Sequence, residues 1–192
     1  MAIKLTKITK KFDDEIVLEN FSQGFKLGKT TCIMGPSGSG KTTLLRMMMG
    51  LVIPDEGLIE GVENFKKSVV FQEERLCENL TVMTNIRLVS QKSLEMTQIT
   101  EALQQVDLPA VCLKQPIQQL SGGQKRRVAI LRALLADYDI LFMDEPFKGL
   151  DLETKRQVMA YVKEMTRGKT VILVTHDPLE CEMMDSEVIY LP

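Results

Sequence analysis

One stretch of the chain combines glycines, a lysine and hydroxyl side chains in a spacing that suits phosphate binding. Residues 35–42 read Gly-Pro-Ser-Gly-Ser-Gly-Lys-Thr and fit the pattern G-x-x-x-x-G-K-[ST] at each fixed position. Glycines allow the backbone to curl so that successive N–H groups point toward phosphate oxygens, and a following helix adds its unpaired N-terminal donors. The expected contacts of a nucleoside triphosphate are Gly35, Pro36, Ser37, Gly38, Ser39, Gly40, Lys41, Thr42 and Thr43.

The segments on either side of this loop match what phosphate binding requires. An apolar stretch, 30–34, precedes the loop, and 43–49 reads as helix. In that setting Lys41 is expected to reach the β- and γ-phosphates, and the Thr42 hydroxyl to ligate Mg²⁺. A flexible Gly/Ser turn is the alternative, and the strand-like and helix-like flanks argue against it.

A second candidate position is the end of the apolar segment 140–143, where Asp144 and Glu145 follow directly. Ligands of open α/β sheets lie beyond the carboxyl ends of the strands, so both carboxylates are expected to face the nucleotide. Asp144 is then a candidate for the Mg²⁺ shell, and Glu145 for polarising an attacking water. A solvated strand end is the alternative, and the phosphate loop upstream makes the site the better interpretation.

Two further positions carry chemistry that is ambiguous when taken alone. Residues 120–124 read Leu-Ser-Gly-Gly-Gln before a predicted helix. Ser121 suits an N-cap, but an N-cap requires neither two glycines nor Gln124. Exposed N–H groups at a helix start can also bind phosphate, and these cannot all serve the nucleotide held by the first loop. His176, the only histidine, follows the apolar segment 171–174, and a lone histidine is usually structural.

Composition narrows the class of protein. With 192 residues, 44% of them hydrophobic, the chain can bury a core as one compact unit. The net charge of −2 offers no basic field for nucleic acid. No apolar run has the length of a membrane span, and residues 1–4 lack the apolar core of a signal peptide. Reduced, scattered thiols in the cytoplasm are expected for Cys32, Cys77, Cys112 and Cys181.

Alternating strand and helix patterns predict an α/β fold. Apolar residues between 3 and 25 indicate antiparallel strands, and buried strands are expected at 68–71, 139–143 and 170–175, with 187–191 closing the chain. Helical patterns cover 121–136 and 152–165. The polar segment of about 73–120 is interpreted as a small helical subdomain inserted in a single domain, 1–192. This alternation implies a mostly parallel sheet with helices on both faces.

Together the motifs resemble those of the ATP-binding cassette (ABC) ATPases. Residues 120–124 are similar to the signature motif of that family. The phosphate loop, Gln72, the signature, Asp144-Glu145, Leu150-Asp151 and His176 occur in the family's order, across essentially all 192 residues. The resemblance implies the P-loop fold of ABC type, with an N-terminal antiparallel β-subdomain and a small helical insertion. It also implies a head-to-tail dimer in which each ATP lies between one subunit's phosphate loop and the other's signature.

The resemblance further implies roles for individual residues. Ser121, Gly122, Gly123 and Gln124 would contact the ATP of the opposite subunit. Glu145 would be the general base, Asp144 an acid linked to Mg²⁺, and Gln72 a contact of Mg²⁺ and the attacking water. His176 would hydrogen-bond the γ-phosphate, and Asp151 would belong to the loop between the two sites. Phe12 occupies the place of an adenine-stacking aromatic, usually Tyr, although packing explains an aromatic there equally well.

By resemblance, the chain is expected to be the ATPase subunit of a transporter, closer to bacterial importers than to exporters. A separate transmembrane permease would form the pore, so the subunit would sit peripherally on the cytoplasmic face, as a homo- or heterodimer. A soluble ABC ATPase that acts on a macromolecular assembly is the alternative, and a binding module that hydrolyses little ATP is a second one. One departure stands out: Lys148 and Gly149 occupy positions of usually small residues, so Lys148 is expected to alter the dimer contact.

Overall fold

The computed structural model describes residues 2–13, 15–90 and 94–191. Its centre is a parallel sheet of β3 (Thr30–Met34), β5 (Lys67–Val70), β6 (Ile140–Asp144), β7 (Thr170–Val174) and β8 (Glu187–Tyr190). The strand order is β5-β6-β7-β3-β8, and each neighbouring pair is parallel. The predicted mostly parallel sheet is confirmed.

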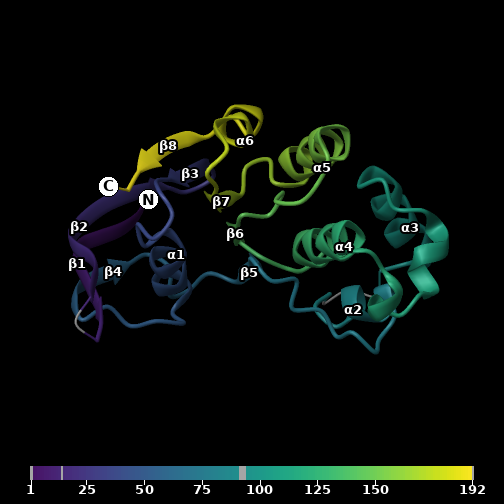
Figure 1. Cartoon of the computed structure of the whole chain (residues 1–192), viewed down its shortest axis with the longest axis horizontal. Helices are drawn as coiled ribbons and strands as arrows, with labels where there is room; N and C mark the ends of the chain where they lie inside the picture. Colours follow the sequence, from purple (N-terminus) through teal and green to yellow (C-terminus); the bar gives the residue numbers. More distant parts are fainter. Residues whose placement is uncertain (1, 14, 91–93, 192) are drawn as a thin grey trace.

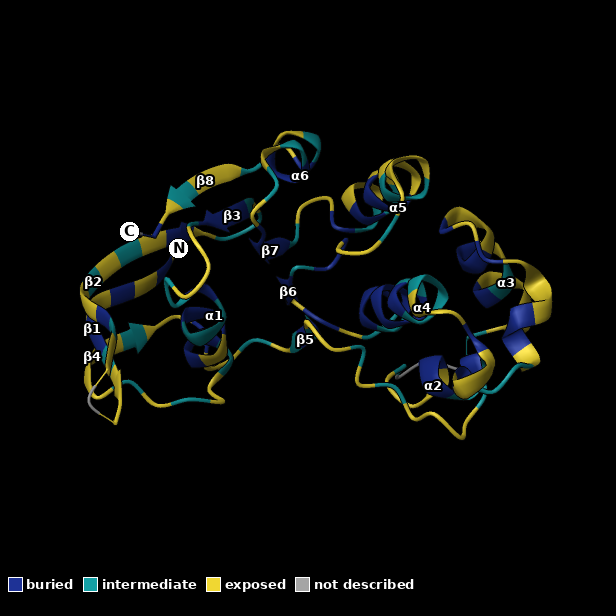
Figure 2. Ribbon diagram, in the orientation of Figure 1, coloured by how far each residue is buried: buried dark blue, intermediate teal, exposed yellow. Residues whose placement is uncertain are grey.

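Successive side chains of a strand point to opposite faces of the sheet. Each face therefore packs in its own buried cluster, with different helices. Ile140 and Phe142 pack in one buried cluster with α1 (Lys41–Met49) and the N-terminal strands. Leu141 and Met143 pack in the other cluster, with α4 (Gly122–Leu134), α5 (Leu152–Met165) and α6 (Pro178–Met183). Figure 2 shows β6 and β7 as buried strands between these layers.

The N-terminal strands form a separate antiparallel sheet of order β2-β1-β4, made of β1 (Ala2–Phe12), β2 (Glu15–Lys26) and β4 (Glu56–Glu60). The first two strands were predicted. The third was not, because 53–57 reads as a turn and only Ile59 of β4 is even partly buried, so its sequence lacks an apolar alternation. This sheet lies beside α1, at the end of the molecule opposite α2 and α3 (Figure 1).

The segment predicted as a helical insertion contains α2 (Val82–Arg87), α3 (Met96–Gln105) and two 3₁₀ helices, η1 (Ala110–Lys114) and η2 (Ile117–Gln119). Its apolar side chains, such as Ile86 and Leu103, belong to the same buried cluster as Leu141 of the parallel sheet. The core therefore continues from the sheet into these helices. In the part of the chain that the structure describes, no helix has both the length and the apolar character needed to cross a membrane.

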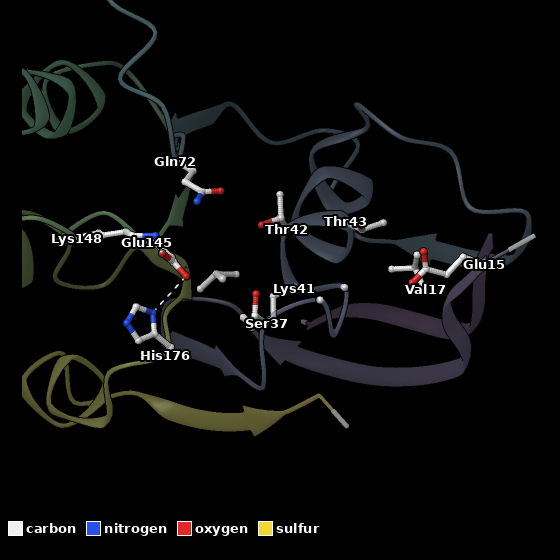
Figure 3. Close-up of a pocket in the computed structure, with 13 residues that line it drawn as sticks. Glu15, Val17, Ser37, Lys41, Thr42, Thr43, Gln72, Glu145, Lys148 and His176 are labelled. Atoms are coloured by element: carbon white, nitrogen blue, oxygen red, sulfur yellow. Dashed lines mark hydrogen bonds and ion pairs between the residues drawn. The ribbon is translucent and has the colours of Figure 1, made fainter. Parts of the chain in front are cut away.

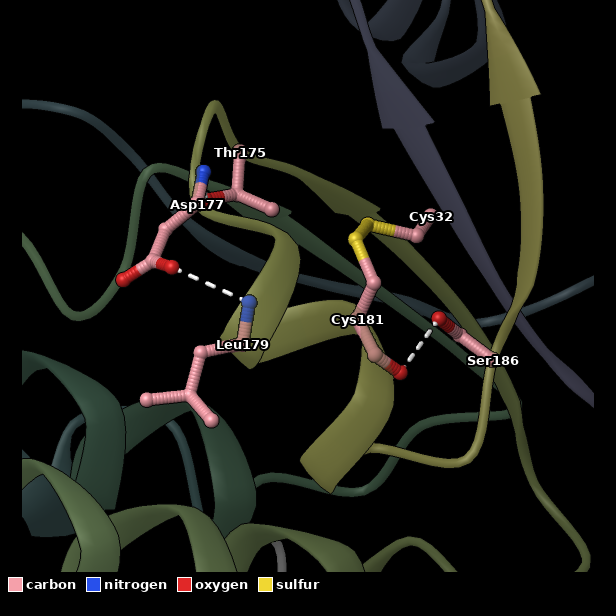
Figure 4. Close-up of a disulfide and its surroundings, with 6 residues drawn as sticks. All are labelled: Cys32, Thr175, Asp177, Leu179, Cys181 and Ser186. Carbon is pink, nitrogen blue, oxygen red and sulfur yellow. Dashed lines mark hydrogen bonds between the residues drawn. A yellow bond between two sulfur atoms is a disulfide. The ribbon is translucent and has the colours of Figure 1, made fainter.

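The prediction that all four cysteines are reduced thiols is wrong for Cys32 and Cys181. Cys32 of β3 and Cys181 of α6 form a disulfide, with their Cα atoms 5.9 Å apart and a sequence separation of 149 (Figure 4). The pair meets because α6 lies over the face of β3 to which Cys32 points, a consequence of topology that spacing does not reveal. Cys77 and Cys112 are free.

Candidate functional site

The predicted phosphate loop connects β3 to α1, in the strand–loop–helix order that anion binding requires. The Lys41 ammonium donates to the carbonyl oxygens of Gly35 at 2.9 Å and Pro36 at 2.6 Å, so it spans the loop. Gly40 has φ +85°, and a Cβ there would lie 2.9 Å from Val17 Cγ1 and 3.0 Å from the Val17 oxygen. Only glycine fits this position without displacing β2.

Beside this loop lies a cavity of about 610 Å³ that collects residues from distant parts of the sequence. Figure 3 shows them converging from the phosphate loop, from the ends of β5, β6 and β7, and from β2. Of the predicted residues, the lining includes Ser37, Gly38, Gly40, Lys41, Thr42, Thr43, Gln72, Glu145 and His176. The sequence did not single out three of the others, Glu15, Val17 and Val174, and assigned Lys148 only to a dimer contact.

Asp144 ends β6 beside Thr42 and is buried. Burial raises the pKa of Asp144 above its ordinary value, although a hydrogen bond with Thr42 acts in the opposite direction. Its Oδ1 atom is buried without a hydrogen-bond partner. A buried, unpartnered carboxylate oxygen next to a hydroxyl is an arrangement that suits Mg²⁺, which prefers oxygen ligands and completes its shell with phosphate oxygens and water.

Glu145 lies at the same strand end in a backbone conformation unusual for a side-chain-bearing residue. Its φ is +45°, and its N–H donates to the Val174 oxygen at 2.9 Å, which fixes the turn. One carboxylate oxygen, Oε1, lies 3.3 Å from His176 Nδ1, and the other, Oε2, lies 3.2 Å from Lys148 Nζ. Burial acts to raise the pKa of Glu145, but Lys148 and His176 together outweigh it and hold that pKa below its ordinary value.

Gln72 lies on an exposed loop that follows β5, and hydrogen bonds from α4 hold this loop in place. The Arg126 guanidinium is buried and donates to the carbonyl oxygens of Phe71, at 2.8 Å, and of Gln72. Nothing in the sequence pattern distinguishes Arg126, because a short Lys-Arg-Arg run is typical of a solvated helix face. Its position five residues after Ser121 places it one helical turn behind the predicted signature, on the inner face of α4.

The predicted signature forms the first turn of α4 and does not line the cavity. The Ser121 hydroxyl accepts from the Gln124 N–H at 3.3 Å, and the Gln124 side-chain oxygen accepts from the Ser121 N–H at 2.9 Å. This reciprocal capping box fixes the helix start. A Cβ at Gly122 would meet nothing within 4 Å, so the backbone is open to an approaching group on that side.

Asp151 and Phe12 also lie outside the lining of this cavity. Asp151 caps α5, and its Oδ1 accepts from the Thr154 N–H at 3.0 Å, an interaction that lowers the pKa of Asp151. Phe12 is exposed at the end of β1, with the Lys10 ammonium 5.1 Å from the centre of its ring. Glu15 and Val17, at the start of the next strand, reach the cavity instead. Adenine stacking by Phe12 stays a prediction.

The parallel sheet, with its glycine loop between β3 and α1, is the P-loop nucleotide-binding fold. A family model described as "ABC transporter" matches residues 18–148, more than half of the chain. The chain therefore belongs to the ABC transporter family, and the resemblance inferred from the motifs is confirmed.

Curated relatives are ATP-binding proteins of import systems. A spermidine/putrescine import ATP-binding protein, PotA, of Acetivibrio thermocellus is 36% identical, and the match covers 100% of this chain and 58% of that protein. An aliphatic sulfonates import ATP-binding protein, SsuB 3, of Rhodococcus jostii is also 36% identical, with 100% of this chain and 71% of the relative covered. This chain spans little more than half the length of the PotA relatives that it matches.

A solved structure with the same fold is the dimeric, post-hydrolysis state of the ATP-binding cassette MJ0796 bound to ADP and Pi. It is 32% identical, with a TM-score of 0.84, and the match covers 98% of this chain and 94% of that one. The ABC-type cassette fold predicted for this chain is thus confirmed.

Proposed function

We propose that this chain binds and hydrolyses ATP to power import through separate transmembrane permease subunits. The observation that carries the proposal is the convergence of the phosphate loop, Gln72, Glu145 and His176 on one cavity. These residues come from four different segments, and each brings a group that phosphoryl transfer uses: an ammonium, an amide, a carboxylate and an imidazole. The import function of the named relatives supports the transport role.

In the proposed reaction, the phosphate-loop N–H groups and Lys41 hold the β- and γ-phosphates. Water attacks the γ-phosphorus, the bond to the oxygen that leaves with ADP breaks, and a carboxylate oxygen of Glu145 takes the water proton. The Gln72 amide orients that water, and His176 hydrogen-bonds the γ-phosphate. The products are ADP and inorganic phosphate.

We further propose that Mg²⁺ is held by the Thr42 hydroxyl, Asp144 and Gln72. The unpartnered, buried Oδ1 of Asp144 supports this assignment. No cluster of three or more His, Cys, Asp or Glu suited to a metal exists among the residues that the structure describes, so substrate phosphate oxygens would complete the shell. When bound, Mg²⁺ neutralises charge that develops on the phosphate oxygens.

The working unit that we propose is a head-to-tail dimer, with identical or different partners. Ser121, Gly122, Gly123 and Gln124 lie outside the cavity of their own chain, and the open backbone at Gly122 suits contact with the ATP of a second subunit. Asp151, on an exposed helix start, would lie between the two sites. The dimeric form of the solved relative supports this arrangement.

The same proposal assigns a location and a partner. The subunit would be peripheral on the inner face of the cell membrane, attached through its permease, with no nucleic-acid partner. Adenine would stack on the exposed ring of Phe12.

Glu145→Gln tests this proposal, because it keeps the shape of the site while removing the base. The tagged variant, held with Mg-ATP in its native host, is expected to accumulate as a dimer and to bring down a polytopic membrane protein after gentle solubilisation. Lys163→Met, a charge change on the exposed face of α5, serves as the matched control and should hydrolyse normally. Soluble partners alone would favour an ABC ATPase acting on a macromolecular assembly, and unimpaired hydrolysis by Glu145→Gln would refute the site assignment.

A further inference from the structure

His176 lies between two residues whose positions are fixed by the fold. Thr175 is buried, and its N–H donates to the Ile33 oxygen of β3 at 3.3 Å. The Asp177 N–H donates to the Thr175 hydroxyl at 3.1 Å, and Asp177 Oδ1 accepts from the Leu179 N–H at 3.0 Å as the N-cap of α6 (Figure 4). The neighbours of His176 therefore set its backbone position, whereas its side chain is 64% exposed at the cavity.

The second carboxylate oxygen of Asp177 contacts a lysine from another helix. Lys155 Nζ lies 2.8 Å from Asp177 Oδ2 and 2.7 Å from Oε1 of Glu180, a residue in the first turn of α6. The Asp177 carboxylate thus caps α6 with one oxygen and pairs with Lys155 through the other. The Lys155 side chain is only 15% exposed, and charges that are shielded from water attract each other more strongly than exposed ones.

Lys155 is itself held by the start of α5. Its N–H donates to the carbonyl oxygen of the N-cap Asp151 at 2.8 Å, in the first hydrogen bond of that helix. Lys155 therefore contacts Asp151 through its backbone and Asp177 through its side chain. A lysine held at both ends has given up the rotamer freedom of an exposed lysine, so the position of Asp177 depends on that of α5.

We propose that Lys155 is a positioning residue that places His176 for its contact with the γ-phosphate by holding Asp177. This role rests on the proposed function, in which His176 hydrogen-bonds the γ-phosphate. A group that contacts a reacting phosphate must be placed to within about 1 Å. Lys155 also ties His176 to the start of α5, where Asp151 is proposed to lie between the two sites of the dimer.

An ion pair can also serve stability alone, and a buried residue of the same helix separates the two roles. Met159, one helical turn after Lys155, is 1% exposed and packs in the buried cluster below the sheet. Met159→Ala should destabilise the fold through the cavity that it leaves, with the contacts of Lys155 in place. Lys155→Met removes those contacts, while the disulfide between Cys32 and Cys181 still attaches α6 to β3.

The kinetic test compares Lys155→Met, Lys155→Arg, Met159→Ala and wild type as purified chains, each corrected for the fraction that binds a fluorescent ATP analogue. In Lys155→Met, kcat should fall roughly ten- to a hundredfold, because displacing a group at the reacting phosphate by about 1 Å can cost that much. Affinity for the analogue should change little, since Lys41 and the phosphate loop are unaltered. Lys155→Arg should recover most of the loss, because a guanidinium keeps the charge and has donors for both carboxylates. Met159→Ala should keep the wild-type kcat.

Two further readouts report on His176 itself. In a His176→Ala background, Lys155→Met should cause little additional loss of kcat, because two residues that act through one contact are not additive. His176 is also the only histidine of the chain, so its imidazole gives the only histidine signal. With ¹³C-labelled histidine, no histidine tag and a non-hydrolysable ATP analogue bound, that signal should be sharp in wild type and Met159→Ala, and broadened or split in Lys155→Met.

The outcomes separate this role from the proposed function. An unchanged kcat in Lys155→Met, an equal loss in Met159→Ala, a full additional loss in the His176→Ala background or an unaltered imidazole signal would each overturn the role of Lys155 and leave the proposed function intact. Wild-type hydrolysis by Glu145→Gln or by His176→Ala would instead overturn the proposed site.

Discussion

The ammonium of Lys155 lies 2.7 Å from Glu180 Oε1, and the Glu180 side chain is only 4% exposed. The same ammonium lies 2.8 Å from Asp177 Oδ2. Lys155 is in the first turn of α5, four residues after the N-cap Asp151, whereas Asp177 and Glu180 follow His176. Lys155 therefore links the start of α5, which follows the proposed inter-site loop at Asp151, to the segment after His176, the proposed contact of the γ-phosphate.

Removing this lysine should destabilise the fold. In Lys155→Met the buried Glu180 carboxylate loses its cation, and its Oε2 is already without a hydrogen-bond partner. Breaking a buried pair from one side costs about 3–5 kcal/mol, and the partial exposure of Lys155 favours the lower end. Urea unfolding measures the difference. Lys155→Met with Glu180→Gln should recover part of the loss, and equal stability of the single and double variants would contradict this account.

The ion pairs of Lys155 with Asp177 and Glu180 should also make the stability of the fold depend on pH. The Lys155 hydrogen bond holds the pKa of Asp177 below its ordinary 3.8, so the stability that Asp177 contributes is present above pH 3.8 and is lost as pH falls through the lower, folded value. Burial would lower the pKa of Lys155, but Asp177 and Glu180 raise it above 10.5, so its contribution is present below pH 10.5 and lost above.

Unfolding free energies of wild type and Lys155→Met, measured from pH 3 to 11, check this. The difference in unfolding free energy between the two proteins should be largest and constant between about pH 4 and 10, and it should become smaller below and above that range. A difference that stays constant down to pH 3 would show that Asp177 is not stabilised by the lysine.

The disulfide between Cys32 and Cys181 should make stability depend on reducing agent. It closes a loop with a sequence separation of 149, and cross-links of that length contribute about 3–5 kcal/mol, chiefly by restricting the unfolded chain. Dithiothreitol should lower the unfolding free energy of wild type by that amount and should leave a Cys32→Ala/Cys181→Ala variant unaffected. Cys77→Ala, at an exposed free thiol, is the matched control and should respond to dithiothreitol as wild type does.

The sequence was informative where a pattern is local. Buried strands such as β6 and β7 are continuous apolar runs, and the phosphate loop is one contiguous segment. The short helix α6 was missed, although Asp177 as N-cap followed by Pro178 is a recognisable helix start. Six residues give too little periodicity to be noticed without that signal.

Features that depend on topology could not be predicted in the same way. Cys32 and Cys181, or Lys155 and Glu180, meet only because α5 and α6 lie on the same face of the sheet. Lys148 was noted as a departure from the family pattern, but its ion pair with Glu145 depends on the turn between them, in which the Lys148 N–H donates to the Glu145 oxygen. The role of such residues follows from the fold and not from their spacing.

Arg126 joins the proposed signature helix to the loop of Gln72, and this link should matter more for hydrolysis than for binding. Its guanidinium donates from Nη1 and Nη2 to two successive carbonyl oxygens, those of Phe71 and Gln72, and the compact ammonium of a lysine does not match this planar fork. In Arg126→Lys the loop should loosen and the Gln72 amide should lose its position at the cavity. Because misplacing a water-orienting group by about 1 Å can cost up to a hundredfold, kcat should fall by roughly ten- to a hundredfold.

Nucleotide affinity should change little in Arg126→Lys, since the hydrogen bonds that hold Lys41 go to Gly35 and Pro36, within the phosphate loop itself. Titration with a fluorescent ATP analogue measures affinity, and single-turnover hydrolysis measures the chemical step. Lys125→Met is the matched control, because Lys125 is the neighbouring cation on α4 and forms an ion pair with the exposed Glu78. A large loss of affinity in Arg126→Lys, or an equal loss of kcat in Lys125→Met, would show that the effect spreads through α4 as a whole and is not transmitted by the two carbonyl contacts.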